Sequence, residues 1–73
     1  MPAVPKHRRR LGARIRLFRK AADLSQEKLA ELSDLHPVYV GNVERGEENI
    51  SIDSLVRIAH ALKVTVRELA ADL

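Results

Sequence analysis

The stretch LSQEKLAELSDLHPVYVGNVERG, which occupies residues 24–46, decides how this chain folds. The hydroxyl of Ser25 can cap the free amides at the start of a helix, so we expect a helix over residues 26–33. Residues 34–36 are short and polar enough to form a tight turn. Pro37 suits the first turn of the next helix, because proline has no backbone N–H to leave unpaired. The stretch therefore predicts two short helices joined by a turn.

The second of these helices is expected over residues 37–45, with Gly46 as its left-handed stop. Its sequence is poor for an isolated helix, because it contains β-branched valines and an internal glycine that costs about 1 kcal/mol relative to alanine. Neighbouring elements must therefore hold it in place. Val40 and Val43 are spaced i, i+3 and are expected to bury one side of the helix. The residues left on its other faces are Val38, Tyr39, Asn42 and Arg45.

Hydrophobic periodicity extends the helical prediction to both sides of this pair. A first helix is expected over residues 7–22, a fourth is capped by Ser51, and a capping box of Thr65 and Glu68 opens a short last helix. The side chains expected to face inward are Leu11, Ile15, Phe18 and Ala22 in the first helix, Leu29 and Leu32 in the second, Ile52, Leu55, Ile58, Ala59 and Leu62 in the fourth, and Val66 and Leu69 in the last. The predicted fold is an all-α, compact five-helix bundle without strands.

The length and composition of the chain are those of one compact soluble domain. Its 73 residues are 45% hydrophobic and 32% charged, and a chain of this size has room for a single core. Such a core rarely contributes more than roughly 3–5 kcal/mol, so small domains usually depend also on disulfides, a metal or a second copy. The chain has no cysteine and its three histidines lack metal-ligand spacing, so we expect no metal and no cofactor. Self-association remains as the expected support.

The N-terminal end is expected to form a flexible arm over residues 1–6, followed by one domain over residues 7–73, because Pro2 and Pro5 keep the first residues out of a helix. No signal peptide is expected, since the basic run at residues 6–10 is followed by arginines where an unbroken apolar segment is required. No run approaches 18 apolar residues, so no membrane span is expected. These features predict a cytoplasmic protein.

The basic residues are concentrated at one end of the chain. Residues 1–22 contain eight Lys or Arg and no acid, a formal charge of +8, whereas residues 23–73 contain five Lys or Arg and ten acids, a charge of −5. A one-sided basic element on a mildly acidic body favours a polyanion docked on one face. The alternative is a solvated, arginine-rich helix face, and charge alone does not separate the two.

A set of residues in the central stretch forms a recognisable pattern. It consists of Leu24, Ser25 and Gln26, then Ala30, then Val40 and Val43, and finally Glu44, Arg45 and Gly46. This set resembles the Xre/Cro-type helix-turn-helix family, the fold of phage repressors, over about residues 8–70. Two such helices cross at a steep angle, and a small side chain such as Ala30 fits the crossing. The resemblance implies a DNA-binding domain over residues 7–73, in which the start of the third helix enters the major groove.

The resemblance also implies which residues touch DNA. Ser25 and Gln26 match positions that reach the phosphate backbone, although helix capping is the alternative for both. The positions that face base edges are occupied by His36, Pro37, Val38 and Asn42, and those beside the backbone by Arg45 and Asn49. Tyr39 has two alternatives: a hydroxyl that reaches a phosphate, which we favour, or a ring packed beside the helix.

The base-facing positions depart from the family pattern. Glutamine or arginine is common where Pro37 and Val38 stand, so only His36 and Asn42 can hydrogen-bond a base here. We therefore expect a few base contacts supplemented by the reading of DNA shape. At the turn, Asp34 stands where glycine is common, and it is expected to adopt the left-handed conformation.

Arg19 and Glu44 match a pair that forms a salt bridge in similar repressors, between the first helix and the end of the third. If the pair is partly buried, removal of one partner leaves an unpaired charge and costs about 3–5 kcal/mol. The implied role of the pair is to hold the reading helix in position.

The function we predict is transcriptional regulation by a homodimer bound to a two-fold operator in double-stranded DNA. The sequence contains no second domain, so Leu69, Ala70 and Leu73, in and after the last helix, are expected to form the dimer interface. Single-domain family members of this size resemble restriction-modification controller proteins and small phage or plasmid regulators, and of these roles we expect the controller first.

The alternative function is that of an antitoxin, which binds a toxin protein and autoregulates its operon. A flexible extension for wrapping the toxin would favour it, and the residues after Ala70 supply almost none. An enzyme is not expected, because the chain has no cysteine, no glycine-rich phosphate loop and no nucleophile with a base at plausible spacing. No small-molecule ligand is expected either.

Overall fold

The computed structural model describes residues 3–73, and these form five helices with no strand among them. The helices are α1 (Lys6–Ala21), α2 (Gln26–Ser33), α3 (Pro37–Glu44), α4 (Ile52–Leu62) and α5 (Val66–Leu69). The expected all-α five-helix fold is confirmed, and the bounds of the first three helices differ from the prediction by at most one residue. None of these helices is both long and apolar enough to cross a membrane.

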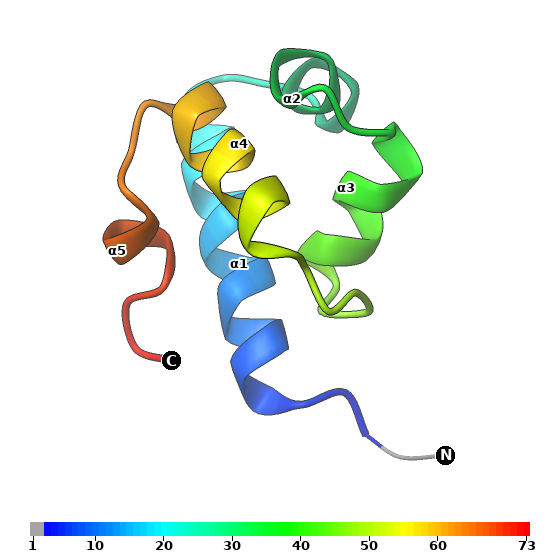
Figure 1. The fold of residues 1–73 in the computed structure, drawn as a ribbon, viewed down its shortest axis with the longest axis vertical. Coiled ribbons are helices and arrows are strands. Elements are labelled where there is room, and N and C mark those ends of the chain that lie inside the picture. Colours follow the sequence, from blue (N-terminus) through cyan, green and yellow to red (C-terminus); the bar gives the residue numbers. More distant parts are fainter. Residues whose placement is uncertain (1–2) are drawn as a thin grey trace.

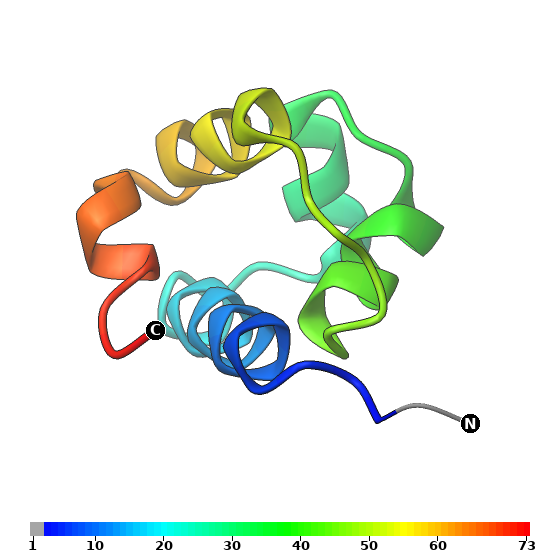
Figure 2. The ribbon, with the colours of Figure 1, turned by 60° about the horizontal axis from the view of Figure 1, so that its bottom comes forward.

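The helices surround one core (Figure 1), and Figure 2 shows α1 and α4 on opposite sides of it. Helix α1 packs against α3, α4 and α5, and α2 packs against α3 and α4. Figure 2 shows α3 and α5 on opposite sides of α1. Helix α3 is therefore held from behind by α1 and α2, and none of the other described elements covers its opposite side.

Local hydrogen bonds mark where the helices begin, as the sequence predicts. The hydroxyl of Ser25 accepts from the Lys28 N–H at 3.0 Å, and Ser51 accepts from the Ser54 N–H at 3.1 Å. Thr65 and Glu68 form the expected reciprocal capping box. Each cap satisfies an amide that would otherwise have no partner in the first turn.

Left-handed residues close α2 and α3 at the expected places. Asp34 has φ 56° and ψ 46°, and Gly46 has φ 77°. Aspartate tolerates this conformation better than most residues, so the chain can turn sharply between the two helices without glycine. The short turn brings α3 back across α2.

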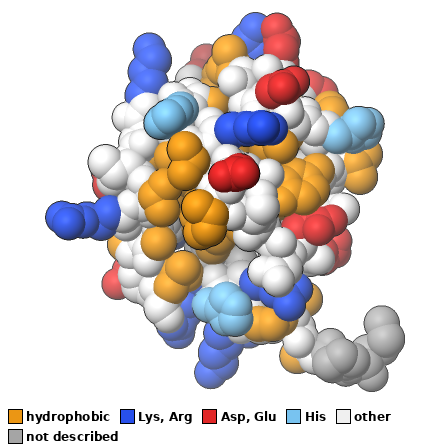
Figure 3. Space-filling model, in the orientation of Figure 1, with side chains coloured by type: hydrophobic (Ala, Val, Ile, Leu, Met, Phe, Trp, Pro, Cys, Tyr) orange, Lys and Arg blue, Asp and Glu red, His pale blue; other side chains and the backbone are white. Residues whose placement is uncertain are grey.

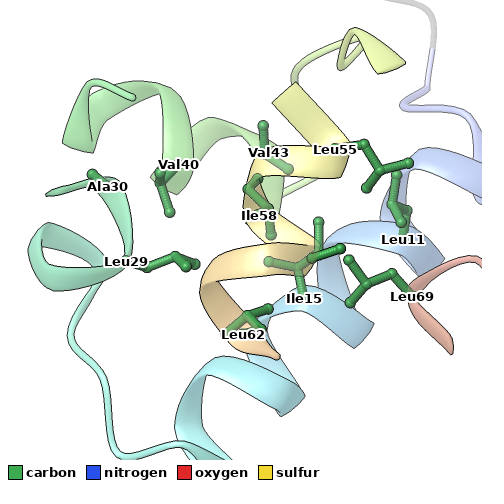
Figure 4. Close-up of a cluster of buried hydrophobic side chains, with 11 residues drawn as sticks. Leu11, Ile15, Leu29, Ala30, Val40, Val43, Leu55, Ile58, Leu62 and Leu69 are labelled. Atoms are coloured by element: carbon green, nitrogen blue, oxygen red, sulfur yellow. The ribbon is translucent and has the colours of Figure 1, made fainter. Parts of the chain in front are cut away.

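The core is a single cluster of buried apolar side chains from all five helices (Figure 4). Its members are Leu11, Ile15, Leu29, Ala30, Val40, Val43, Leu55, Ile58, Ala59, Leu62 and Leu69. Phe18, Leu24, Leu35 and Tyr39 are among the partly buried side chains packed around it. The two valines of α3 thus attach a helix of poor intrinsic propensity to the rest of the fold.

Three residues expected to face inward are exposed. Leu32 is 50% exposed, because the buried side of α2 is formed by Leu29 and Ala30 and lies away from Leu32. Ile52 is 71% exposed, because it is the first residue of α4 and its turn extends past the core. Ala22 is exposed because α1 ends one residue before it.

The position of Leu69 contradicts part of the dimer interface that the sequence predicts. Its side chain is fully buried at 0% exposure and fills the core between α5 and the other helices. A side chain already used inside one copy of the chain has no surface to offer to a second copy. Of the three residues expected at that interface, Ala70 is half-buried and Leu73 is 50% exposed.

Gly12 allows α1 and α3 to approach closely. A Cβ atom at this position would lie 2.4 Å from the carbonyl oxygen of Val43 and 2.5 Å from that of Glu44. Both are backbone atoms, so only a residue without a side chain fits between these helices. The role of Gly12 was not predicted from the sequence, although a glycine on the buried stripe of a long helix is a signal of close packing.

The segment before α1 lies against the end of α3. Cγ1 of Val4 lies 3.0 Å from the point where a Cβ on Gly46 would stand, and Cα of Arg9 lies at the same distance. Residues 1 and 2 of the expected flexible arm lie outside the described residues. The N-terminal part of α1 is thereby placed beside the loop that follows α3.

Candidate nucleic-acid interface

The start of α3 projects from the domain as the sequence predicts. Val40 and Val43 are buried, while His36 and Pro37 are exposed and Val38 is 63% exposed. An apolar side chain this open at the first turn of a helix has no role in the core. The beginning of α3 is thus available to enter a groove of another molecule.

Helices α2 and α3 cross and pack against each other. Ala30 is buried, and a Cβ on Gly41 would meet Nη1 of Arg45 at 3.3 Å and Oε1 of Gln26 at 3.5 Å. A shallow groove of about 280 Å³ lies along this crossing. It is lined by Gln26, Glu27, Pro37, Val38, Gly41 and Arg45.

A buried ion pair joins α1 to the end of α3. Nε of Arg19 lies 2.6 Å from Oε2 of Glu44, and Nη2 of Arg19 donates to Oε1 at 3.0 Å. Nη1 of Arg19 also donates to the backbone oxygen of Leu24 at 2.7 Å. The hydrogen bond with Glu44 raises the pKa of Arg19 above its ordinary value, although burial acts in the opposite direction. Each partner compensates the buried charge of the other, and the pair positions the end of α3 against α1.

Gln26 is part of the same buried network. Its Nε2 donates to Oε1 of Glu44 at 3.0 Å, so the amide links the start of α2 to the end of α3. Gln26 was expected at the phosphate backbone, and its amide N–H₂ is directed inward here. Its neighbour Ser25 forms the cap of α2. Both side chains therefore have a role in the folded domain before any contact with DNA.

Arg45 and Asn42 are connected to each other and to two acids. Nε of Arg45 donates to both carboxylate oxygens of Glu47 at 3.2 Å, and its Nη2 donates to Oδ1 of Asn42. Nδ2 of Asn42 donates to Oε1 of Glu48 at 3.4 Å. The guanidinium expected beside a phosphate thus has a carboxylate as its present partner. Sequence spacing did not reveal this network, since it depends on how the loop after α3 folds back.

The remaining expected contact residues have simpler surroundings. Asn49 is exposed in the loop after α3, and Tyr39 is half-buried with its ring packed against the core. His36 caps α3 by accepting the Val38 N–H at Nδ1, a role that was not predicted from the sequence. The sequence signal for such a cap is a proline at the first position of a helix, because the residue directly before it is the N-cap.

One side of α1 carries a row of cations. Its exposed members are Lys6, Arg9, Arg10, Arg16 and Lys20, and none of them forms an ion pair within residues 3–73. Lys and Arg side chains project at the lower edge of the molecule in Figure 3, over the N-terminal half of α1. Within the same described part of the chain, no group of acidic or histidine side chains could hold a metal ion. The charge of the row is suited to a polyanion.

Two helices crossed at a tight turn, with the second one open at its start, define a helix-turn-helix DNA-binding protein. The model of the helix-turn-helix family matches residues 15–69, and the chain belongs to this family of transcriptional regulators.

The similar proteins include regulators from restriction-modification systems. The control protein C.SmaI of Serratia marcescens is 44% identical over 59 residues, which cover 81% of this chain and 70% of that protein. The crystal structure of the restriction-modification controller protein C.AhdI from Aeromonas hydrophila is 48% identical, covers 84% of this chain and 92% of that one, and has a TM-score of 0.83. The structure of the biofilm regulator SinR in complex with DNA is 33% identical, covers 81% of this chain and 95% of that one, and has a TM-score of 0.78.

Proposed function

We propose that the chain acts in the cytoplasm as a homodimer that binds a two-fold operator and controls transcription in a restriction-modification system. The observation that carries the proposal is the exposed start of α3, a helix whose other end is fixed to α1 by the buried pair of Arg19 and Glu44. A helix presented in this way fits the major groove, where base edges are read. The similarity to C.SmaI and C.AhdI supports the controller role.

The proposal of a homodimer rests on the size of the contact surface and on the apolar surface near α5. One domain of this kind covers few base pairs, and two copies would place their reading helices about 34 Å apart in successive major grooves. Apolar side chains gather over α4 and α5 in Figure 3. The exposed or half-buried apolar residues here include Ile52 and Val56 in α4, Val66 in α5, and Ala70 and Leu73 after α5.

Direct binding measurements test this function. Duplexes are selected from a random-sequence pool by the full chain, and the tightest one is titrated by fluorescence anisotropy at several salt concentrations. We expect two chains per duplex and a log affinity that falls with log salt with a slope near −0.9 per phosphate contacted. Scrambling the selected sequence should weaken binding by about 1000-fold or more. Absence of binding to any duplex at low salt would exclude the proposed function.

Replacement of Glu47 should strengthen DNA binding. In Glu47→Ala the guanidinium of Arg45 loses its carboxylate partner and becomes free for a phosphate, and one negative charge leaves the interface. Exposed ion pairs are worth little, so we expect affinity to rise about 2- to 5-fold with no measurable loss of stability. Anisotropy titration of the selected duplex measures the change.

A matched control removes the same charge elsewhere. Glu31 forms an exposed pair with Lys28 on α2 at 3.5 Å and does not contact Arg45. Glu31→Ala should leave the affinity within about 2-fold of the original. If Glu31→Ala strengthens binding as much as Glu47→Ala does, the effect is one of net charge, and Arg45 does not contact a phosphate.

A further inference from the structure

We infer that His36 determines specificity by donating a hydrogen bond from Nε2 to an acceptor on a base edge, and that the cap of α3 sets this polarity. The inference rests on the proposed function, because it concerns the same contact with the major groove. It adds to that function the chemical kind of base edge that the protein requires.

The cap determines which nitrogen of His36 carries the proton. Nδ1 accepts the Val38 N–H at 3.1 Å, and Val38 has the first free amide of α3 because Pro37 has none. In a neutral imidazole one nitrogen accepts and the other donates. When Nδ1 accepts, Nε2 therefore carries the hydrogen and can only donate. The exposed ring presents this N–H at the open start of the helix.

At the other base-facing positions, no side-chain polar atom is without a partner in the folded domain. Pro37 and Val38 have no side-chain donor or acceptor, and both amide atoms of Asn42 are already bonded to Arg45 and Glu48. Within residues 3–73, Nε2 of His36 has no hydrogen-bond partner in the folded domain. Among the four expected base-facing residues, His36 is thus the one with a side-chain polar atom, Nε2, that has no hydrogen-bond partner in the described part of the chain.

A single donor selects among base edges in the major groove. Guanine presents N7 and O6, adenine presents N7 and thymine presents O4, and all of these accept a hydrogen bond. The amino groups of cytosine and adenine are donors and cannot pair with Nε2–H. The operator is therefore expected to place an acceptor beneath His36, and Val38 next to it can contact a thymine methyl group.

Two substitutions separate the cap from the reading atom. Asparagine and aspartate are both good N-cap residues, so His36→Asn and His36→Asp should keep the start of α3, as checked by circular dichroism and thermal melting. Asparagine retains a side-chain donor, whereas aspartate has only acceptors. We expect His36→Asn to bind the wild-type operator within about 3-fold, and His36→Asp to lose about 10-fold or more.

The decisive readout is the preferred base, since the charge of aspartate weakens binding to every duplex. Each variant selects duplexes from the same random pool as the wild type. We expect the His36→Asp sites to change at one position per half-site to a base that presents an amino group, such as cytosine. Identical preferred bases in the wild type and His36→Asp would overturn the role of His36. A wild type that selects no sequence at all would instead contradict the proposed function.

Discussion

Gly12→Ala is expected to lower the free energy of unfolding by about 3 kcal/mol, a large part of the total for a domain of this size. The added Cβ would lie 2.4 Å from the Val43 oxygen and 2.5 Å from the Glu44 oxygen. Both atoms belong to the backbone, so α3 must move away from α1 to admit the methyl group. Urea unfolding followed by circular dichroism measures the loss.

The same displacement should weaken DNA binding, because the reading helix is the element that moves. Gly41→Ala provides the matched control, since this glycine is also helical and buried. A Cβ there would meet only the ends of two flexible side chains, at 3.3 Å from Arg45 and 3.5 Å from Gln26. Alanine is favoured over glycine within helices by about 1 kcal/mol, so Gly41→Ala should change stability by no more than that. Equal losses in the two variants would contradict the close packing of α1 on α3.

Glu44→Ala is expected to cost about 3–5 kcal/mol, because it leaves the buried guanidinium of Arg19 without its partner. The amide of Gln26 loses its acceptor at the same time. The control is Glu47→Ala, which removes a half-exposed carboxylate and should change stability by less than about 1 kcal/mol. Thermal unfolding of the two variants gives the comparison, and similar melting temperatures would show that the pair does not hold α3.

A double-mutant cycle separates the pair from the general effect of losing side chains. Arg19→Ala with Glu44→Ala should be less destabilised than the sum of the single variants, because no lone buried charge remains. The raised pKa of Arg19 means that the protonated form gains stability on folding. Such a contribution is fully present below the ordinary pKa of arginine and is lost only above it. From the arginine side, the pair should therefore remain intact across the neutral pH range.

Most of the helical framework could be predicted from local sequence signals. Ser25, Ser51 and Thr65 identified three helix starts, and Asp34 and Gly46 identified two left-handed ends. These signals work because a cap or a turn depends on residues three or four positions apart. The errors at Leu32 and Ile52 have a different origin, since helical spacing alone does not determine how wide the buried side of a short helix is.

The candidate site could be predicted as a set of positions but not as a set of interactions. The exposed start of α3 agrees with the interpretation of residues 36–38 as outward-facing. The engagement of Arg45 by Glu47, and of Gln26 by Glu44, could not be read from spacing. Both hydrogen bonds require a carboxylate within reach of the donor. The position of that carboxylate is set by the folded loop after α3 in one case and by the packed helices in the other.

The sequence by itself determined five helices, the caps of three of them, the helix-turn-helix family and the concentration of cations in α1, because all of these depend on residue type and short-range spacing. Only the tertiary structure decided that Gly12 must lack a side chain and that Leu69 belongs to the core. It also decided that the amide of Asn42 is engaged while Nε2 of His36 stays free. The physical reason is that each of these properties depends on how the helices and loops pack in space, and neither residue type nor helical period specifies that packing.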